Sequence, residues 1–135
     1  CLLKMGDRDA LANDALLWIT RAKSIVVNDE IYCAESLAYT AKMSVNPTLR
    51  WFTYESKIKN TLSLAKKLNP NNPRAYILEA NIQHKLPFIF GGGCKSAKPL
   101  IQKAEMFFST QTKANSIEPT WGIQSLVKLK KACPY

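Results

Sequence analysis

The sequence predicts an all-α fold of about five to six antiparallel helices, stacked as helical hairpins. Apolar residues recur with a period near 3.6 through most of the chain, as on the buried face of an amphipathic helix. Proline and asparagine separate these segments, and no stretch alternates apolar and polar residues for long enough to build a sheet. A chain of 135 residues that is 47% hydrophobic is therefore expected to form a single domain over residues 1–135.

The first half of the chain is expected to hold three helices, over residues 9–27, 29–45 and 53–68. Asn28 or Asp29 can cap the second helix, because a short polar side chain accepts a hydrogen bond from a free backbone N–H group. Pro47 is expected to end that helix, since the residue before a proline avoids the helical conformation. Residues 47–52 are then expected to form a connection to the third helix.

The second half is expected to hold three more helices, over residues 73–86, 95–110 and 120–133. Pro73 suits the first turn of its helix, and Pro87 is expected to close it. A glycine-rich loop before a helix can bind phosphate. The loop Gly91–Gly93 lacks the Gly-Lys-Ser/Thr ending of a nucleotide-binding loop, however. We therefore expect a turn that reverses the chain and packs Phe88 and Phe90.

Two parts of the chain echo one another. Residues 29–36 align without gaps on the segment that ends at residue 80, which places Tyr32 with Tyr76 and Ser36 with Ala80. Three other helices share one spacing of apolar residues, at Ala15, Ile19 and Ala22, at Ile58, Leu62 and Ala65, and at Ala97, Ile101 and Ala104. The loops within the hairpins are expected to carry insertions. This echo indicates a helical repeat.

The segment Leu64–Ala80 resembles the junction between two tetratricopeptide repeats. Small side chains at Ala65 and Ala80 let helices approach closely, so both are expected to be almost fully buried. Tyr76 is expected to fill the space between the helices, and Pro70 stops the first of them. The resemblance implies a tetratricopeptide-like α-solenoid, an architecture that binds other proteins and rarely carries out chemistry.

Three motifs make the resemblance closer: the junction Leu68–Tyr76, the glycine-rich insertion Phe90–Gly93, and a Pro-x-Trp-Gly motif at Pro119–Gly122. Together they resemble a family of small, often exported bacterial tetratricopeptide proteins, over about residues 29–133. Cys94 departs from the family pattern, in which a charged residue is more common. The resemblance implies export to the bacterial periplasm or cell envelope, although we recognise no signal peptide in the chain. It implies no reaction.

The net charge is +9 and is concentrated after residue 35. Residues 1–35 hold six acids and four bases, whereas residues 36–135 hold four acids and fifteen bases. Such a surface can attract nucleic acid, another polyanion, anionic lipid or an acidic partner. Aromatic residues do not alternate with the bases as on a stacking platform for nucleic acid. A solvated basic surface is therefore favoured over a nucleic-acid site.

The four cysteines, Cys1, Cys33, Cys94 and Cys133, form no Cys-x-x-Cys pair. Only His84 could join them as a ligand, so no metal site is predicted. Cys33 is expected to be a buried free thiol within a helix. A disulfide between Cys94 and Cys133 is a candidate if the chain is exported. A catalytic cysteine is disfavoured, because His84 is not close in sequence to any cysteine.

The expected binding surface is a concave groove lined by the first helix of each hairpin. On the helix 73–86 we assign Tyr76 and Ala80 to the packed face and the opposite face to the groove. With the matching positions of the last helix, the candidate groove residues are Arg74, Ile77, Asn81, His84, Lys85, Leu126 and Lys130. This groove could hold an extended peptide or a carboxylate.

The sequence therefore predicts a non-enzymatic scaffold that binds an unknown protein or peptide, with no cofactor. A basic adaptor for nucleic acid or another polyanion is the alternative. A thiol-dependent enzyme that uses Cys94 or Cys133 is the least favoured hypothesis. No transmembrane segment is predicted, since no apolar run approaches about 18 residues. The oligomeric state stays open.

Overall fold

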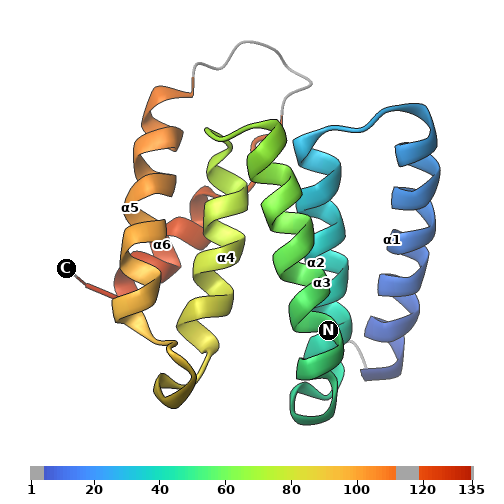
Figure 1. The fold of residues 1–135 in the computed structure, drawn as a ribbon, viewed down its shortest axis with the longest axis horizontal. Helices are drawn as coiled ribbons and strands as arrows, with labels where there is room; N and C mark the ends of the chain where they lie inside the picture. The colour runs from blue at the N-terminus through green and yellow to red at the C-terminus, as the bar shows by residue number, and fades with distance from the viewer. Residues whose placement is uncertain (1–4, 112–118, 135) are drawn as a thin grey trace. The chain divides into compact units, whose positions relative to one another are not determined.

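In the computed structural model, which describes residues 5–111 and 119–134, every regular element is helical. The elements in chain order are α1 (Met5–Ile25), α2 (Asp29–Val45), α3 (Pro47–Leu68), α4 (Pro73–Lys85), the 3-10 helix η1 (Phe88–Phe90), α5 (Cys94–Thr110) and α6 (Ile123–Ala132) (Figure 1). No strand occurs within these described residues. The predicted all-α fold is confirmed.

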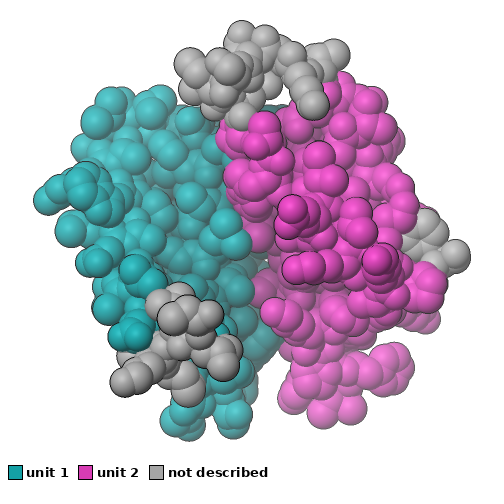
Figure 2. Space-filling model, turned by 180° about the vertical axis from the view of Figure 1, so that it is seen from behind, with its two compact units in different colours: residues 1–69 teal, residues 70–135 magenta. Residues whose placement is uncertain are grey.

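The chain divides into two compact units, residues 1–69 and residues 70–135 (Figure 2). In the first unit, α1 packs against α2 and α2 packs against α3. In the second unit, α4 packs against α5, and α6 contacts both of them. The single domain predicted over residues 1–135 stays a prediction.

The predicted connection over residues 47–52 is wrong, because these residues form the first turns of α3. Asn46 alone separates α2 from α3, and its side chain accepts a hydrogen bond from the backbone N–H of Leu49 at 3.3 Å. Pro47 follows this cap, at a position where a helix needs no N–H donor. The extra residues within this hairpin thus lengthen the helices and form no inserted loop.

The other helix limits differ from the predicted ones by smaller amounts. α1 begins at Met5, four residues before the predicted start at Asp9. α6 begins at Ile123, three residues after the predicted start at Thr120. Gly122 has a φ of 109°, a left-handed conformation that a right-handed helix cannot include, so α6 cannot begin earlier. The predicted polar loop over residues 111–119 lies mostly outside the described residues.

Equivalent residues of the two similar segments are buried to the same extent. Ser36 of α2 and Ala80 of α4 are both 0% exposed. The triplets of α3 and α5 are buried as well, at Ile58, Leu62 and Ala65 and at Ala97, Ile101 and Ala104. Asparagines cap both first helices, Asn28 for α2 and Asn72 for α4. The prediction that Ala65 and Ala80 are almost fully buried is confirmed.

Tyr76, which was expected to fill the space between the helices of the repeat junction, has a partner within the second unit. Its ring lies 5.3 Å from the ring of Phe107 on α5, centroid to centroid. Its hydroxyl donates a hydrogen bond to the carbonyl oxygen of Pro70 at 2.9 Å. Tyr76 therefore fixes the turn before α4 and the contact of α4 with α5.

Candidate functional site

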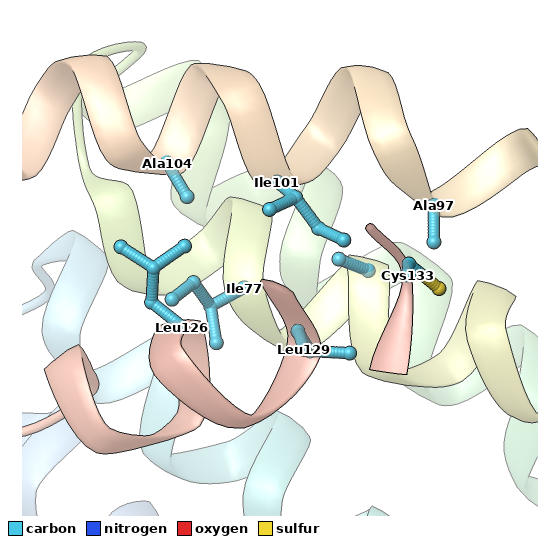
Figure 3. Packing of buried hydrophobic residues seen from close by; sticks show 8 residues of the cluster. Ile77, Ala97, Ile101, Ala104, Leu126, Leu129 and Cys133 are labelled. Carbon is cyan, nitrogen blue, oxygen red and sulfur yellow. The ribbon is translucent and has the colours of Figure 1, made fainter. Parts of the chain in front are cut away.

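The second unit has a core built from one face of each of its three α-helices. Figure 3 shows the side chains of α5 pointing toward those of α6, with Ile77 of α4 among them. The buried members are Ile77, Ala80, Ala97, Ile101, Ala104, Leu126, Leu129 and Cys133. The core combines small alanines with branched aliphatic side chains, which lets the helices approach closely. This core sets the positions of every side chain discussed below.

Two of the predicted groove residues, Ile77 and Leu126, belong to this core. Ile77 is 0% exposed and Leu126 is 7% exposed. The face of α4 that was assigned to the groove is covered by α6, which packs against α4 and α5. These two side chains therefore have no surface to offer a ligand, and their placement in the groove is corrected to the core.

Arg74, another predicted groove residue, is also buried, with 2% of its surface exposed. Its Nε donates a hydrogen bond to the carbonyl oxygen of Trp121 at 3.2 Å, and a terminal nitrogen donates to the carbonyl oxygen of Pro119. The guanidinium group also lies against the rings of Phe108 and Trp121. Arg74 thus holds the segment before α6 and is not a groove residue.

The remaining groove candidates are Asn81, His84 and Lys85 of α4 and Lys130 of α6. The side-chain amide of Asn81 donates to the carbonyl oxygen of Ile77 on the same helix at 3.1 Å. Lys130 of α6 forms an ion pair with Glu105 of α5. Lys85 is exposed at the end of α4, and His84 beside it faces two cysteines. Asn81 lies one helical turn before His84 and Lys85 on α4, so these three residues share one end of that helix.

An exposed apolar turn follows α4. Phe88, Ile89 and Phe90 are 81%, 82% and 65% exposed. The expectation that this turn packs Phe88 and Phe90 is therefore wrong. Because exposed apolar side chains are unfavourable in water, a contiguous group of them commonly marks a contact surface. We call these three residues the apolar tip.

The glycine-rich loop holds the apolar tip in place. The N–H of Gly91 donates to the carbonyl oxygen of Phe88 at 2.9 Å, that of Gly92 to Pro87 at 3.2 Å, and that of Gly93 to Gln83 at 2.8 Å. All three amides are used within the turn, so none is directed at an external phosphate. The predicted chain reversal is confirmed.

Lysines lie on both sides of the apolar tip in the sequence. Lys85 precedes it at the end of α4 and Lys95 follows it in the first turn of α5, and both are exposed. The hydroxyl of Ser96 donates to the carbonyl oxygen of Gly91 at 2.6 Å, which ties the loop to that first turn of α5. The result is an exposed apolar turn with an exposed lysine on each side of it in the sequence.

The candidate disulfide between Cys94 and Cys133 is present, with a Cα–Cα distance of 5.2 Å. His84 lies beside it, with Nδ1 at 3.6 Å from the Sγ of Cys94 and at 3.3 Å from the Sγ of Cys133. The sequence argument that His84 is remote from every cysteine therefore fails in three dimensions. Cys33, by contrast, is a buried cysteine of α2 in the first unit, and its predicted burial is confirmed.

Neither a protein-family model nor a curated protein matches the sequence. Among solved structures, the chain matches the HusA haemophore from Porphyromonas gingivalis with a TM-score of 0.87 and 34% sequence identity. The chain is similar to a haemophore. The match covers 96% of this chain and 65% of that chain, so this chain spans a little under two thirds of that protein.

The similarity to HusA supports two predictions from the sequence in general terms, the helical architecture and the binding role. HusA is a helical-repeat protein, which supports the repeat architecture without the finer tetratricopeptide assignment. It is also a non-enzymatic haem-binding protein, so the predicted binding, non-catalytic role agrees with the comparison. Among the described residues, no helix is both long and apolar enough to span a membrane.

Proposed function

We propose that this chain is a non-enzymatic binding protein for haem or a related porphyrin. The observation that carries the proposal is the similarity to the HusA haemophore, at 34% identity over 96% of this chain. The fold also leaves apolar side chains in solvent, where a flat apolar ligand would cover them. HusA is a haemophore, and the sequence motifs of this chain resemble those of exported proteins.

We assign the porphyrin to the apolar tip. A porphyrin has a flat apolar macrocycle and two propionate groups, so it needs aromatic or aliphatic contacts for the ring and cations for the carboxylates. Phe88, Ile89 and Phe90 supply the apolar contacts. Lys85 and Lys95, at the two ends of the turn, supply charges of the sign that attracts propionate.

A protein or peptide partner, the first hypothesis from the sequence, has no support beyond the repeat architecture. Three of the predicted groove residues are buried, namely Arg74, Ile77 and Leu126. The polyanion hypothesis rests on the net charge of +9 alone. A porphyrin accounts for the exposed side chains of the apolar tip together with the lysines at its two ends, so we favour it over these two alternatives.

The proposal is tested by titrating the protein with haem and with metal-free protoporphyrin while the Soret absorbance is recorded. We expect saturable binding with a Kd of about 1 μM or tighter, which corresponds to about −8 kcal/mol. Binding of both ligands would indicate that the macrocycle is recognised, and binding of haem alone would indicate a ligand to the iron. An unchanged spectrum with both ligands would overturn the proposal.

The assignment to the apolar tip is tested with the double variant Phe88→Ser and Phe90→Ser. We expect porphyrin binding to weaken by about tenfold or more, since about 1.4 kcal/mol corresponds to a factor of ten. Phe52→Ser on α3 is the matched control, because Phe52 is 83% exposed and lies in the other unit. Equal binding by the two variants would place the ligand elsewhere while leaving the porphyrin proposal itself intact.

A further inference from the structure

Three helix ends of the second unit meet at the disulfide. His84 lies in the last turn of α4, Cys94 is the first residue of α5, and Cys133 follows the last residue of α6. Each of them lies on the core-facing side of its helix, one turn from a core residue. His84 follows Ala80, Cys94 precedes Ala97, and Cys133 follows Leu129. Because the core fixes these three faces against one another, it also fixes the imidazole and the two sulfur atoms at one end.

The distances suit a metal centre. With Zn–S bonds of about 2.3 Å and a Zn–N bond of about 2.0–2.1 Å, tetrahedral geometry separates an imidazole nitrogen from each thiolate by about 3.5 Å. The Nδ1 of His84 already lies 3.6 Å from the Sγ of Cys94 and 3.3 Å from that of Cys133. Only the two sulfur atoms must separate, to about 3.8 Å in the same geometry.

The backbone leaves room for that separation. The Cα atoms of Cys94 and Cys133 are 5.2 Å apart, so rotation about the Cα–Cβ bonds moves the sulfur atoms apart without a change in the helices. Cys133 is 1% exposed, whereas Cys94 and His84 are partly exposed. An ion would therefore be shielded on the Cys133 side and could enter from the side of His84.

We propose that, when its disulfide is reduced, this chain binds a thiophilic d10 metal ion such as Zn²⁺ through the Sγ of Cys94, the Sγ of Cys133 and the Nδ1 of His84. Two thiolates and one imidazole are the ligand set that such ions prefer. They fill three of four tetrahedral positions, and the fourth is open to water or to a further ligand. The disulfide form of the site cannot bind the ion in this way, because its sulfur atoms are not thiolates.

An external dithiol is the reductant that opens the disulfide between Cys94 and Cys133. The dithiol gives two electrons and two protons to the S–S bond, which breaks to leave a thiol on Cys94 and on Cys133, while the dithiol becomes a disulfide. A divalent ion then displaces both thiol protons to solvent. The neutral His84 keeps its proton on Nε2 and binds the ion through Nδ1. The metal–dithiolate centre carries no net charge.

The test uses a variant with Cys1→Ser and Cys33→Ser, so that the only thiols are those of the site. It is reduced with dithiothreitol, freed of reductant without air, and titrated with Co²⁺ as a spectroscopic substitute for Zn²⁺. We expect a sulfur-to-cobalt charge-transfer band that saturates at about one equivalent and disappears when Zn²⁺ is added. The oxidised protein is expected to show no such band.

Two substitutions distinguish the site from ordinary thiol binding. His84→Ala is expected to weaken Co²⁺ binding by about tenfold or more, whereas Lys128→Ala, at an exposed residue of α6, should leave it unchanged. Cys94→Ser should abolish the charge-transfer band at the same Co²⁺ concentration. The proposal is overturned if the reduced protein gives no band, if the oxidised protein binds Co²⁺ equally well, or if His84→Ala binds like the unaltered protein.

Reduction removes the cross-link of the second unit, so helix content is measured in parallel by circular dichroism. The melting temperature of the reduced protein is expected to rise when Zn²⁺ is added, since an ion that binds only the folded state stabilises it. The oxidised protein should show no such rise. A reduced protein that loses its helices and does not regain them with Zn²⁺ also overturns the proposal. None of these measurements involves a porphyrin, so they are independent of the proposed function.

Discussion

The Nε of Arg74 donates a hydrogen bond to the carbonyl oxygen of Trp121 across 3.2 Å, from a side chain that is only 2% exposed. A second nitrogen of the guanidinium group donates to the carbonyl oxygen of Pro119. A charged group so deeply buried must be hydrogen-bonded, or its desolvation would destabilise the fold. The first turn of α4 is thereby linked to the Pro-x-Trp-Gly motif that precedes α6.

Replacing Arg74 by Met keeps most of the apolar volume but removes both hydrogen bonds to the carbonyl groups. We expect the free energy of unfolding to fall by about 2–4 kcal/mol, because buried acceptors lose a charged donor. Arg21→Met is the control, since Arg21 is exposed on α1 and only lies over the ring of Trp18, where the expected loss is about 0.5–1 kcal/mol. Urea unfolding measures both. Similar losses for the two variants would show that Arg74 is not a structural anchor.

The glycine-rich loop offers a comparison between two neighbouring glycines. A Cβ added at Gly92 would lie 2.0 Å from the backbone oxygen of Leu86, whereas one at Gly91 would meet nothing within 4 Å. Gly91 has a φ of 79°, so Gly91→Ala should cost about 1–2 kcal/mol from the left-handed conformation alone. Gly92→Ala requires the loop to move and should cost about 2–4 kcal/mol. Thermal unfolding decides the order, and a larger loss for Gly91→Ala would contradict the loop geometry.

Asp9 of the first unit has a pKa lowered to about 2, chiefly by its hydrogen bonds with Arg50 and then by Lys42. Arg50 donates through both terminal nitrogens, at 2.7 and 3.1 Å. A depressed folded-state pKa means that this carboxylate stabilises the fold above its usual pKa of 3.8 and loses the contribution as the pH falls to about 2.

This pH dependence is measured by comparing Asp9→Asn with the unaltered protein. At pH 6 the variant should melt at a lower temperature, and the difference should shrink as the pH falls below about 4 and vanish near pH 2. Glu55→Gln serves as the control, because the pair of Glu55 with Lys59 lies four residues apart on one helix and such pairs contribute little. A difference for Asp9→Asn that does not change with pH would rule out the ion pair as its cause.

The helical repeat could be predicted because local patterns determine it. The apolar spacing of Ile58, Leu62 and Ala65 matches the residues that are buried on α3, and Asn72 followed by Pro73 marks the start of α4. These signals lie within one or two helical turns. Asn46 followed by Pro47 carried the same capping signal as Asn72 with Pro73, and applying it there would have placed the start of α3 correctly.

The site could not be predicted in the same way, because it depends on which helix covers which face. Ile77 and Arg74 were placed on an open side of α4, and no periodicity within α4 indicates that α6 packs there. The approach of His84 to Cys94 and Cys133 likewise follows from three helix ends meeting in space. A usable signal was the position of all three residues on the apolar stripes of their helices.

The burial of Ala80 gives a direct test of the helix phases. Ala80 is 0% exposed and belongs to the core that joins α4, α5 and α6. Replacing it by Leu adds volume where the helices leave none, and such overpacking typically costs about 1–3 kcal/mol. Lys67→Leu is the control, because Lys67 is exposed on α3 and a surface substitution should change stability by no more than about 0.5 kcal/mol. Urea unfolding of both variants measures the difference. A neutral Ala80→Leu together with a damaging Lys67→Leu would mean that the faces of α3 and α4 are wrongly assigned, and the end of the core at His84 with them.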